Sequence, residues 1–167
     1  MRTLVLGIGN SILGDDGIGA HVAQKVAEKI RDESVDVKEV SFDGLNLLEH
    51  IVGYGKLIVI DAILTKSEDV GRIYRLRPEN ITKPSSLTTS PHHFNLAATL
   101  DFGRKLFPNE MPEEVIIFAV GTQDVKQVSE EMTREVKEAA PKVVALVLAE
   151  LGLAPSLALF VLQNTPG

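Results

Sequence analysis

Two kinds of hydrophobic pattern alternate along this chain. Short runs of adjacent apolar residues, typical of strands buried on both faces, are followed by segments in which apolar residues recur every three or four positions, the spacing of an amphipathic helix. The clearest run lies within residues 56–62, and the clearest helical spacing joins Ile18, Val22, Val26 and Ile30. Over the whole chain the two patterns predict strands at 3–6, 35–40, 56–62, 71–77 and 114–120, and helices at 18–30, 45–52, 96–107 and 136–151.

This order of elements predicts a doubly wound α/β fold. With right-handed connections it gives three layers, a twisted sheet of about five mostly parallel strands with helices on both faces. In the common strand order 2-1-3-4-5, the first and third strands are neighbours. The strand at 71–77 alternates apolar residues with three arginines, which favours a more exposed place near an edge of the sheet.

Prolines mark the expected interruptions of this pattern. Residues 78–92 hold three prolines and a cluster of serine and threonine, so we expect a long loop there, and such loops are often functional. Pro141 falls inside the last helix, where it removes a backbone hydrogen bond and predicts a kink or a break. We expect a single domain over residues 1–152, followed by an apolar tail over residues 153–167.

A glycine-rich turn between the first strand and the first helix carries two adjacent carboxylates, Asp15 and Asp16. A dinucleotide-binding fingerprint would need a glycine in place of Ile12, and a P-loop would need Lys followed by Ser or Thr. Two carboxylates repel a pyrophosphate and favour a cation. The simpler interpretation is that one aspartate is the N-cap of the helix, which leaves the other for a ligand.

Composition narrows the class of protein. At 167 residues the chain is long enough for one domain with a sizeable core, and its net charge of -6 argues against a nucleic-acid partner. We expect a soluble, cytoplasmic protein, because no apolar run is long enough to cross a membrane and the N-terminus lacks a signal peptide's pattern. There is no cysteine, so any metal must be held by oxygen and imidazole ligands.

Three residues from distant parts of the chain are predicted to meet at one edge of the sheet. Asp16 lies just beyond the first strand, Asp61 ends the third, and His92 or its neighbour His93 follows the proline-rich segment. Two carboxylates and one imidazole suit a divalent transition metal with open positions, which can polarise a carbonyl and activate water. Each residue also has a simpler explanation, because an aspartate at a strand end accepts hydrogen bonds from the next turn and a histidine after proline caps a helix.

The motifs around these residues resemble the hydrogenase maturation endopeptidases, peptidase family M52, which trim the C-terminus of nickel-iron hydrogenase large subunits. The similarity extends over roughly residues 2–150. It rests on three segments in the right order, namely Gly7-Ile8-Gly9-Asn10 through Gly14-Asp15-Asp16-Gly17-Ile18-Gly19, then Val59-Ile60-Asp61-Ala62, then Ser90-Pro91-His92.

This resemblance implies a metal-dependent endopeptidase whose nickel contacts are Asp16, Asp61 and His92. The nickel would be presented by the substrate, the large-subunit precursor, and would signal that cleavage can proceed. The isolated protein would then carry no tightly bound metal of its own, and we expect it to be a monomer without membrane insertion. Three oxygen and nitrogen ligands can join an ion held by a partner without stripping it from thiolates.

One segment departs from the family, and two other functions stay open. Many members carry Asp-Gly-Gly-Thr after the second strand, where this chain reads Phe42-Asp43-Gly44-Leu45, so the resemblance assigns no role to Asp43. The second hypothesis, in place of an endopeptidase, is a non-catalytic, nickel-dependent checkpoint or chaperone for the large subunit. The third hypothesis is an unrelated metal-dependent hydrolase on the same fold, since fold alone does not decide function.

Overall fold

Five strands form one sheet in the order β2-β1-β3-β5-β4. The computed structural model describes residues 1–10, 14–41, 46–81, 91–123 and 131–153. Within these residues β1, β2, β3 and β5 run parallel, whereas β4 pairs antiparallel with β5. The bounds of the strands are β1 Thr3–Ile8, β2 Val35–Val40, β3 Lys56–Leu64, β4 Ile73–Leu76 and β5 Glu114–Thr122.

The position of β4 at an edge and the pairing of β1 with β3 are confirmed, but the sheet differs from the common 2-1-3-4-5 order, because β5 lies between β3 and β4. Residues 65–72 are the whole connection from β3 to β4, and this is too short for the crossover that a parallel strand needs. The chain therefore turns back, and β4 runs antiparallel. The apolar run of β5 is buried from Val115 onward, as suits a strand paired on both sides.

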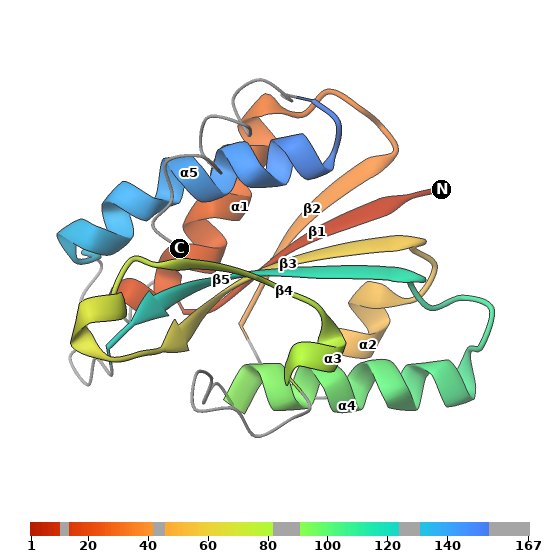
Figure 1. The fold of residues 1–167 in the computed structure, drawn as a ribbon. Helices are drawn as coiled ribbons and strands as arrows, with labels where there is room; N and C mark the ends of the chain where they lie inside the picture. The colour runs from red at the N-terminus through yellow and green to blue at the C-terminus, as the bar shows by residue number, and fades with distance from the viewer. Residues whose placement is uncertain (11–13, 42–45, 82–90, 124–130, 154–167) are drawn as a thin grey trace.

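Helices cover both faces of the sheet, so the predicted three-layer α/β architecture is confirmed (Figure 1). Helices α1 (Ile18–Lys29) and α5 (Arg134–Glu150) pack on one face, where Ile58, Ile60 and Phe118 belong to the core. The other face is covered by α2 (Asn46–Ile51), α3 (Pro78–Ile81) and α4 (Pro91–Leu106). The core on that side is built around buried residues such as Leu6, Val59, Leu96, Leu100 and Ile117.

Glycine lets α1 start directly on the sheet. A Cβ added to Gly19 would lie 2.2 Å from the carbonyl oxygen of Ile8 and 2.5 Å from that of Ile60. One added to Gly7 would lie 2.3 Å from the carbonyl oxygen of Gly19. Since all these neighbours are backbone atoms, neither clash can be relieved by moving a side chain. The two glycines therefore hold the first turn of α1 against the ends of β1 and β3.

Two of the expected interruptions differ from the structure. Pro78 and the next three residues form the short helix α3 rather than a loop, and Pro91 already opens α4, while residues 82–90 lie outside the described residues. The break expected at Pro141 does not occur, because α5 is one continuous helix that contains the proline. Residues 154–167 of the expected tail lie outside the described part. None of the described helices has the length and apolar character needed to span a membrane.

Candidate functional site

The carboxyl end of β1 lies beside the last part of β3, which continues to Leu64. In their parallel register Gly7 is opposite Ile60, so Asp61 is placed next to the end of β1. The chain then passes from β1 into a 3-10 turn, η1 (Gly14–Gly17), which carries both adjacent aspartates and packs against β3. Helix α4 begins on the side toward which β1, β3 and β5 point (Figure 1). Three segments predicted to carry the site therefore reach the same edge of the sheet.

Asp16 is partly buried and closes the loop that follows β1. Its Oδ2 accepts a hydrogen bond from the backbone N–H of Asn10 at 2.8 Å. Gly9, with φ +145°, allows the chain to pass close by, because a Cβ there would lie 2.0 Å from the carbonyl oxygen of Asp16. Among the described residues no partner is assigned to Oδ1 of Asp16. This carboxylate is thus held at one oxygen by the backbone of its own loop.

Asp15 serves a different purpose from its neighbour. Its side chain is 2% exposed, and its two oxygens accept hydrogen bonds from Thr133, from the backbone N–H at 2.6 Å and from Oγ1 at 2.9 Å. Thr133 immediately precedes α5, so Asp15 fastens η1 to the start of that helix. The capping interpretation is wrong for both aspartates, because the N-cap of α1 is Gly17 and no side chain caps it.

Asp61 is a fully buried carboxylate near the end of β3. Its Oδ1 accepts a hydrogen bond from the N–H of Ala62 at 2.8 Å. Its neighbours Ile60 and Ala62 belong to the core under α1 and α5, whereas Val59 and Ile63 belong to the core on the α4 side. Because side chains alternate along a strand, Asp61 faces the α4 side of the sheet. A carboxylate at this depth needs polar partners to remain charged.

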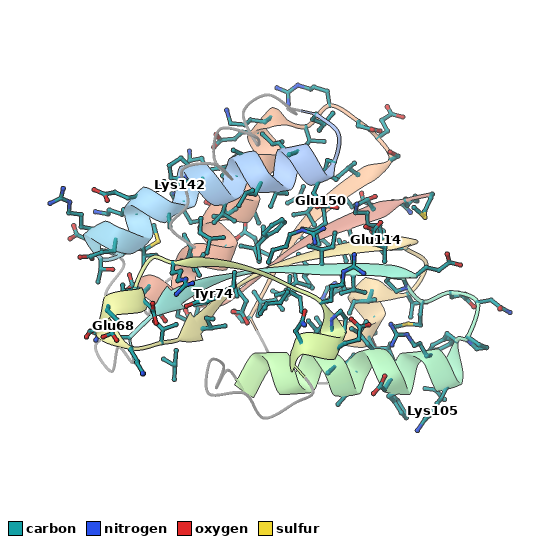
Figure 2. The ribbon with its side chains drawn as sticks, in the orientation of Figure 1. Glu68, Tyr74, Lys105, Glu114, Lys142 and Glu150 are labelled. Atoms are coloured by element: carbon teal, nitrogen blue, oxygen red, sulfur yellow. The ribbon has the colours of Figure 1, made fainter. Side chains whose placement is uncertain are left out.

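A tyrosine missed by the sequence analysis lies in the same row of the sheet. Asp61 is opposite Ala119 on β5, and Ala119 is opposite Tyr74 on β4, so the three side chains share a face. Figure 2 labels Tyr74 on that edge strand. Its hydroxyl is buried and, among the described residues, no partner meets it at full hydrogen-bond geometry, with the Arg72 guanidinium as the nearby donor. The only signal in the sequence was an aromatic residue in an edge strand, which is ordinary for a strand.

The charges around Tyr74 affect its ionisation. Burial raises the pKa of the Tyr74 hydroxyl and the Asp69 carboxylate raises it further, while the positive charge of Arg72 and its polar contact with the hydroxyl oppose them. The Arg72 guanidinium lies 5.3 Å from the centre of the Tyr74 ring and pairs with Asp69 at 3.3 Å. The hydroxyl therefore stays protonated to a higher pH than that of an exposed tyrosine, in the same row of the sheet as Asp61.

His92 and His93 occupy the first turn of α4, which begins with Pro91. The backbone of this turn lies on the side toward which β1 and β3 point (Figure 1), but the two imidazoles are outside the described side chains. Within the side chains that are described, no three of His, Cys, Asp and Glu gather closely enough to hold a metal ion. The predicted meeting of Asp16, Asp61 and His92 stays a prediction, and Asp43 also lies outside the described residues.

Comparisons with known proteins agree with the fold and with the resemblance seen in the motifs. Residues 20–150 match the family described as HycI, hydrogenase maturation protease. The hydrogenase 2 maturation protease of Escherichia coli K12 is 31% identical over 121 residues, covering 72% of this chain and 73% of that protein.

Solved structures lead to the same group. The hydrogenase maturating endopeptidase HybD from E. coli is similar with a TM-score of 0.73 and 30% identity, covering 91% of this chain and 94% of that chain. The NiFe hydrogenase maturation protease HybD from Thermococcus kodakarensis also gives 0.73, with 25% identity over 90% of this chain and 99% of that one. The chain therefore belongs to the hydrogenase maturation protease family and is an endopeptidase.

Proposed function

We propose that this protein removes the C-terminal extension from the large-subunit precursor of a nickel-iron hydrogenase once nickel has been inserted into that precursor. The observation that carries the proposal is the fully buried carboxylate of Asp61, next to the turn that holds Asp16 and at the edge where α4 begins. A carboxylate kept in the core at the carboxyl end of a parallel strand serves binding or catalysis more readily than packing.

In this proposal Asp16, Asp61 and His92 contact the nickel ion that the precursor presents. Carboxylate and imidazole are suitable ligands for a divalent transition metal, whereas soft thiolates bind it more strongly. The three side chains would therefore add to the coordination of an ion already in place and would not remove it. The enzyme needs no tightly held metal of its own.

The same contacts would bring the scissile peptide bond to the edge of the sheet. A nickel ion next to that bond polarises its carbonyl and favours attack by water. The hydrogen bond from Asn10 to Oδ2 of Asp16 supports this role, because it orients the carboxylate and leaves Oδ1 for the ion. A precursor without nickel would lack the contacts that position the bond, so it would be cleaved poorly.

The direct test incubates the purified protein with nickel-loaded and nickel-free precursor and follows the mass of the large subunit. We expect shortening of the nickel-loaded precursor alone. Equal processing of both forms, or of neither, would contradict the proposal. A non-catalytic chaperone would bind the precursor and leave its mass unchanged, and an unrelated hydrolase would retain stoichiometric metal after purification.

Variants assign the role to individual carboxylates. Asp16→Ala and Asp61→Asn should abolish cleavage while the far-UV circular dichroism spectrum stays that of the wild type. Asp101→Asn is the matched control, because Asp101 is an exposed aspartate on α4 whose partner is Arg104 at 3.5 Å. Full activity of Asp16→Ala would remove that residue from the site, and loss of activity in Asp101→Asn would show that the assay reports general damage.

A further inference from the structure

A groove between α1 and α5 is not used by the proposed cleavage site. The two helices pack against each other on the same face of the sheet (Figure 1). The groove has a volume of about 390 Å³, and its floor comes from α5. The apolar residues that line it are Ala140, Pro141, Val144, Ala145 and Leu148.

The rim of this groove is basic although the protein as a whole is acidic. Its ionisable residues, among those described, are His21, Lys25 and Lys29 on α1 and Lys137 on α5, with no carboxylate among the described lining residues. The net charge of the chain is -6, so this gathering of cations runs against the overall balance. Lys25 pairs with Glu28 at 3.1 Å, but both side chains are exposed, and such pairs contribute little.

The spacing of the lining residues suits the docking of a partner helix in the groove. The floor runs over residues 140–148 of α5, which is about 12 Å at the helical rise of 1.5 Å per residue. Lys25 and Lys29 are one turn apart on α1 and stand on the same side of the groove. A helix laid between α1 and α5 would cover the floor with apolar residues at i, i+4 and i+7, and carboxylates one turn apart would reach the two lysines.

We propose that this groove binds an acidic amphipathic helix of the large-subunit precursor, away from the bond that is cut. This proposal rests on the proposed function for the identity of the partner. The groove begins near the end of the sheet that carries the proposed site, although Asp61 itself faces the opposite, α4 side. His21 and Lys137 lie in the first turns of α1 and α5. Both helices start close to the turn that holds Asp16, since Asp15 in that turn bonds Thr133. A precursor held at that edge is therefore within reach of the groove.

The test measures binding of labelled, nickel-loaded precursor by fluorescence anisotropy, together with cleavage at saturating precursor. The double variant Lys25→Glu/Lys29→Glu should raise the Kd about 10-fold at low salt and leave kcat unchanged. The matched control Lys105→Glu/Lys142→Glu makes the same change in net charge at exposed helical lysines outside the groove, both labelled in Figure 2. Its Kd should stay within about 2-fold of the wild type.

A second variant tests the apolar floor. Pro141→Glu places a carboxylate on the floor of the groove and replaces the proline with a residue that α5 accommodates easily. It should also weaken binding, because the negative charge on the floor repels an acidic helix. Thermal unfolding of each variant is the control that the fold is kept.

Each alternative outcome has a distinct signature. An unchanged Kd in Lys25→Glu/Lys29→Glu, or no binding of precursor to the wild type, overturns the docking proposal. A wild-type dimer in sedimentation velocity that dissociates in the same variant assigns the groove to a second copy of this chain and also overturns it. Lysine-dependent binding without any cleavage would instead refute the proposed function and leave the docking surface intact.

Discussion

Two aspartates that are adjacent in the sequence have different roles, one structural and one proposed to be chemical. Asp15 is buried and its hydrogen bonds go to Thr133, whereas Asp16 is partly exposed and, among the described residues, accepts a hydrogen bond from the backbone of its own loop. Their order follows from the 3-10 turn that precedes α1, which directs adjacent side chains to different sides. Spacing along the sequence cannot reveal this difference, because Thr133 lies 118 residues away from Asp15.

Removing Asp15 should therefore cost stability rather than chemistry. Asp15→Ala loses two hydrogen bonds to a charged acceptor, and we expect the free energy of unfolding to fall by about 2 kcal/mol. Urea denaturation measures the change, and cleavage well below the unfolding transition should continue. Wild-type stability combined with complete loss of cleavage would contradict this assignment and move Asp15 into the site.

The two tyrosines of the chain offer a second contrast between residues. Tyr54 donates a hydrogen bond to Oδ2 of Asp36 at 2.8 Å, while the buried hydroxyl of Tyr74 meets no partner at full hydrogen-bond geometry among the described residues. Tyr54→Phe should lower the free energy of unfolding by about 1 kcal/mol, and Tyr74→Phe should leave it unchanged or raise it, since a buried hydroxyl without a partner is costly. Similar losses in both variants, measured by urea denaturation, would show that the Tyr74 hydroxyl is hydrogen-bonded in solution, with Arg72 as the nearest described donor.

At the scale of elements, the hydrophobic pattern predicts the buried strands and the long helices well. The run at 56–62 and the spacing from Ile18 to Ile30 correspond to β3 and α1, because burial on two faces or on one stripe leaves a local signature. The pairing of β5 between β3 and β4 has no such signature, since it depends on contacts between distant strands. The short helix α3 was also missed, because Pro78 at a first helical position looks like a breaker in a proline-rich segment.

Pro141 lies inside the unbroken helix α5 and is expected to lower the stability of that helix. The ring removes the N–H that would bond the carbonyl of Lys137, and a proline in a helix interior costs about 3 kcal/mol relative to alanine. Pro141→Ala should therefore raise the unfolding free energy, by about 1–3 kcal/mol, as measured in urea. Pro78→Ala is the control and should have little effect, because Pro78 is the first residue of α3, where no helical N–H bond is lost. A destabilised Pro141→Ala would show that the ring's packing in the groove outweighs its backbone cost.

For the molecule as a whole, topology brings the proposed site residues to one edge. Parallel strands end on the same side of the sheet, so a motif after β1 and an aspartate near the end of β3 were predictable as neighbours from the order of elements, although β3 continues to Leu64. The burial of Asp61 on the α4 side, and the row it shares with Ala119 and Tyr74, required the register of three strands. Because the side chain of His92 lies outside the described residues, its approach to the two carboxylates is still a prediction.

The opposite end of the sheet, where the parallel strands β3 and β5 begin, is held together by charges from distant elements. Glu150, the last residue of α5, pairs with Lys56 at 3.0 Å and with Arg75 at 3.1 Å, and Lys56 also pairs with Glu114 at 3.3 Å. Figure 2 labels Glu114 and Glu150 at this end of the sheet. Burial by itself would raise the pKa of Glu150, but the hydrogen bonds and charges of Lys56 and Arg75 together lower it below the ordinary value of 4.5.

This network should appear in the acid unfolding of the protein. A carboxyl whose pKa is lower in the folded state stabilises the fold above its ordinary pKa of 4.5, and that contribution is lost as the pH falls through the folded value. The free energy of unfolding of the wild type minus that of Glu150→Gln should thus be positive and constant near neutral pH and should shrink below 4.5. Glu138→Gln, whose carboxylate pairs with Arg134 at an exposed site, is the control and should follow the wild type at every pH. If the difference in unfolding free energy between wild type and Glu150→Gln stays the same from neutral to strongly acidic pH, the substitution acts through lost packing and not through lost charge. Lys56 and Arg75 would then not stabilise the ionised form of Glu150.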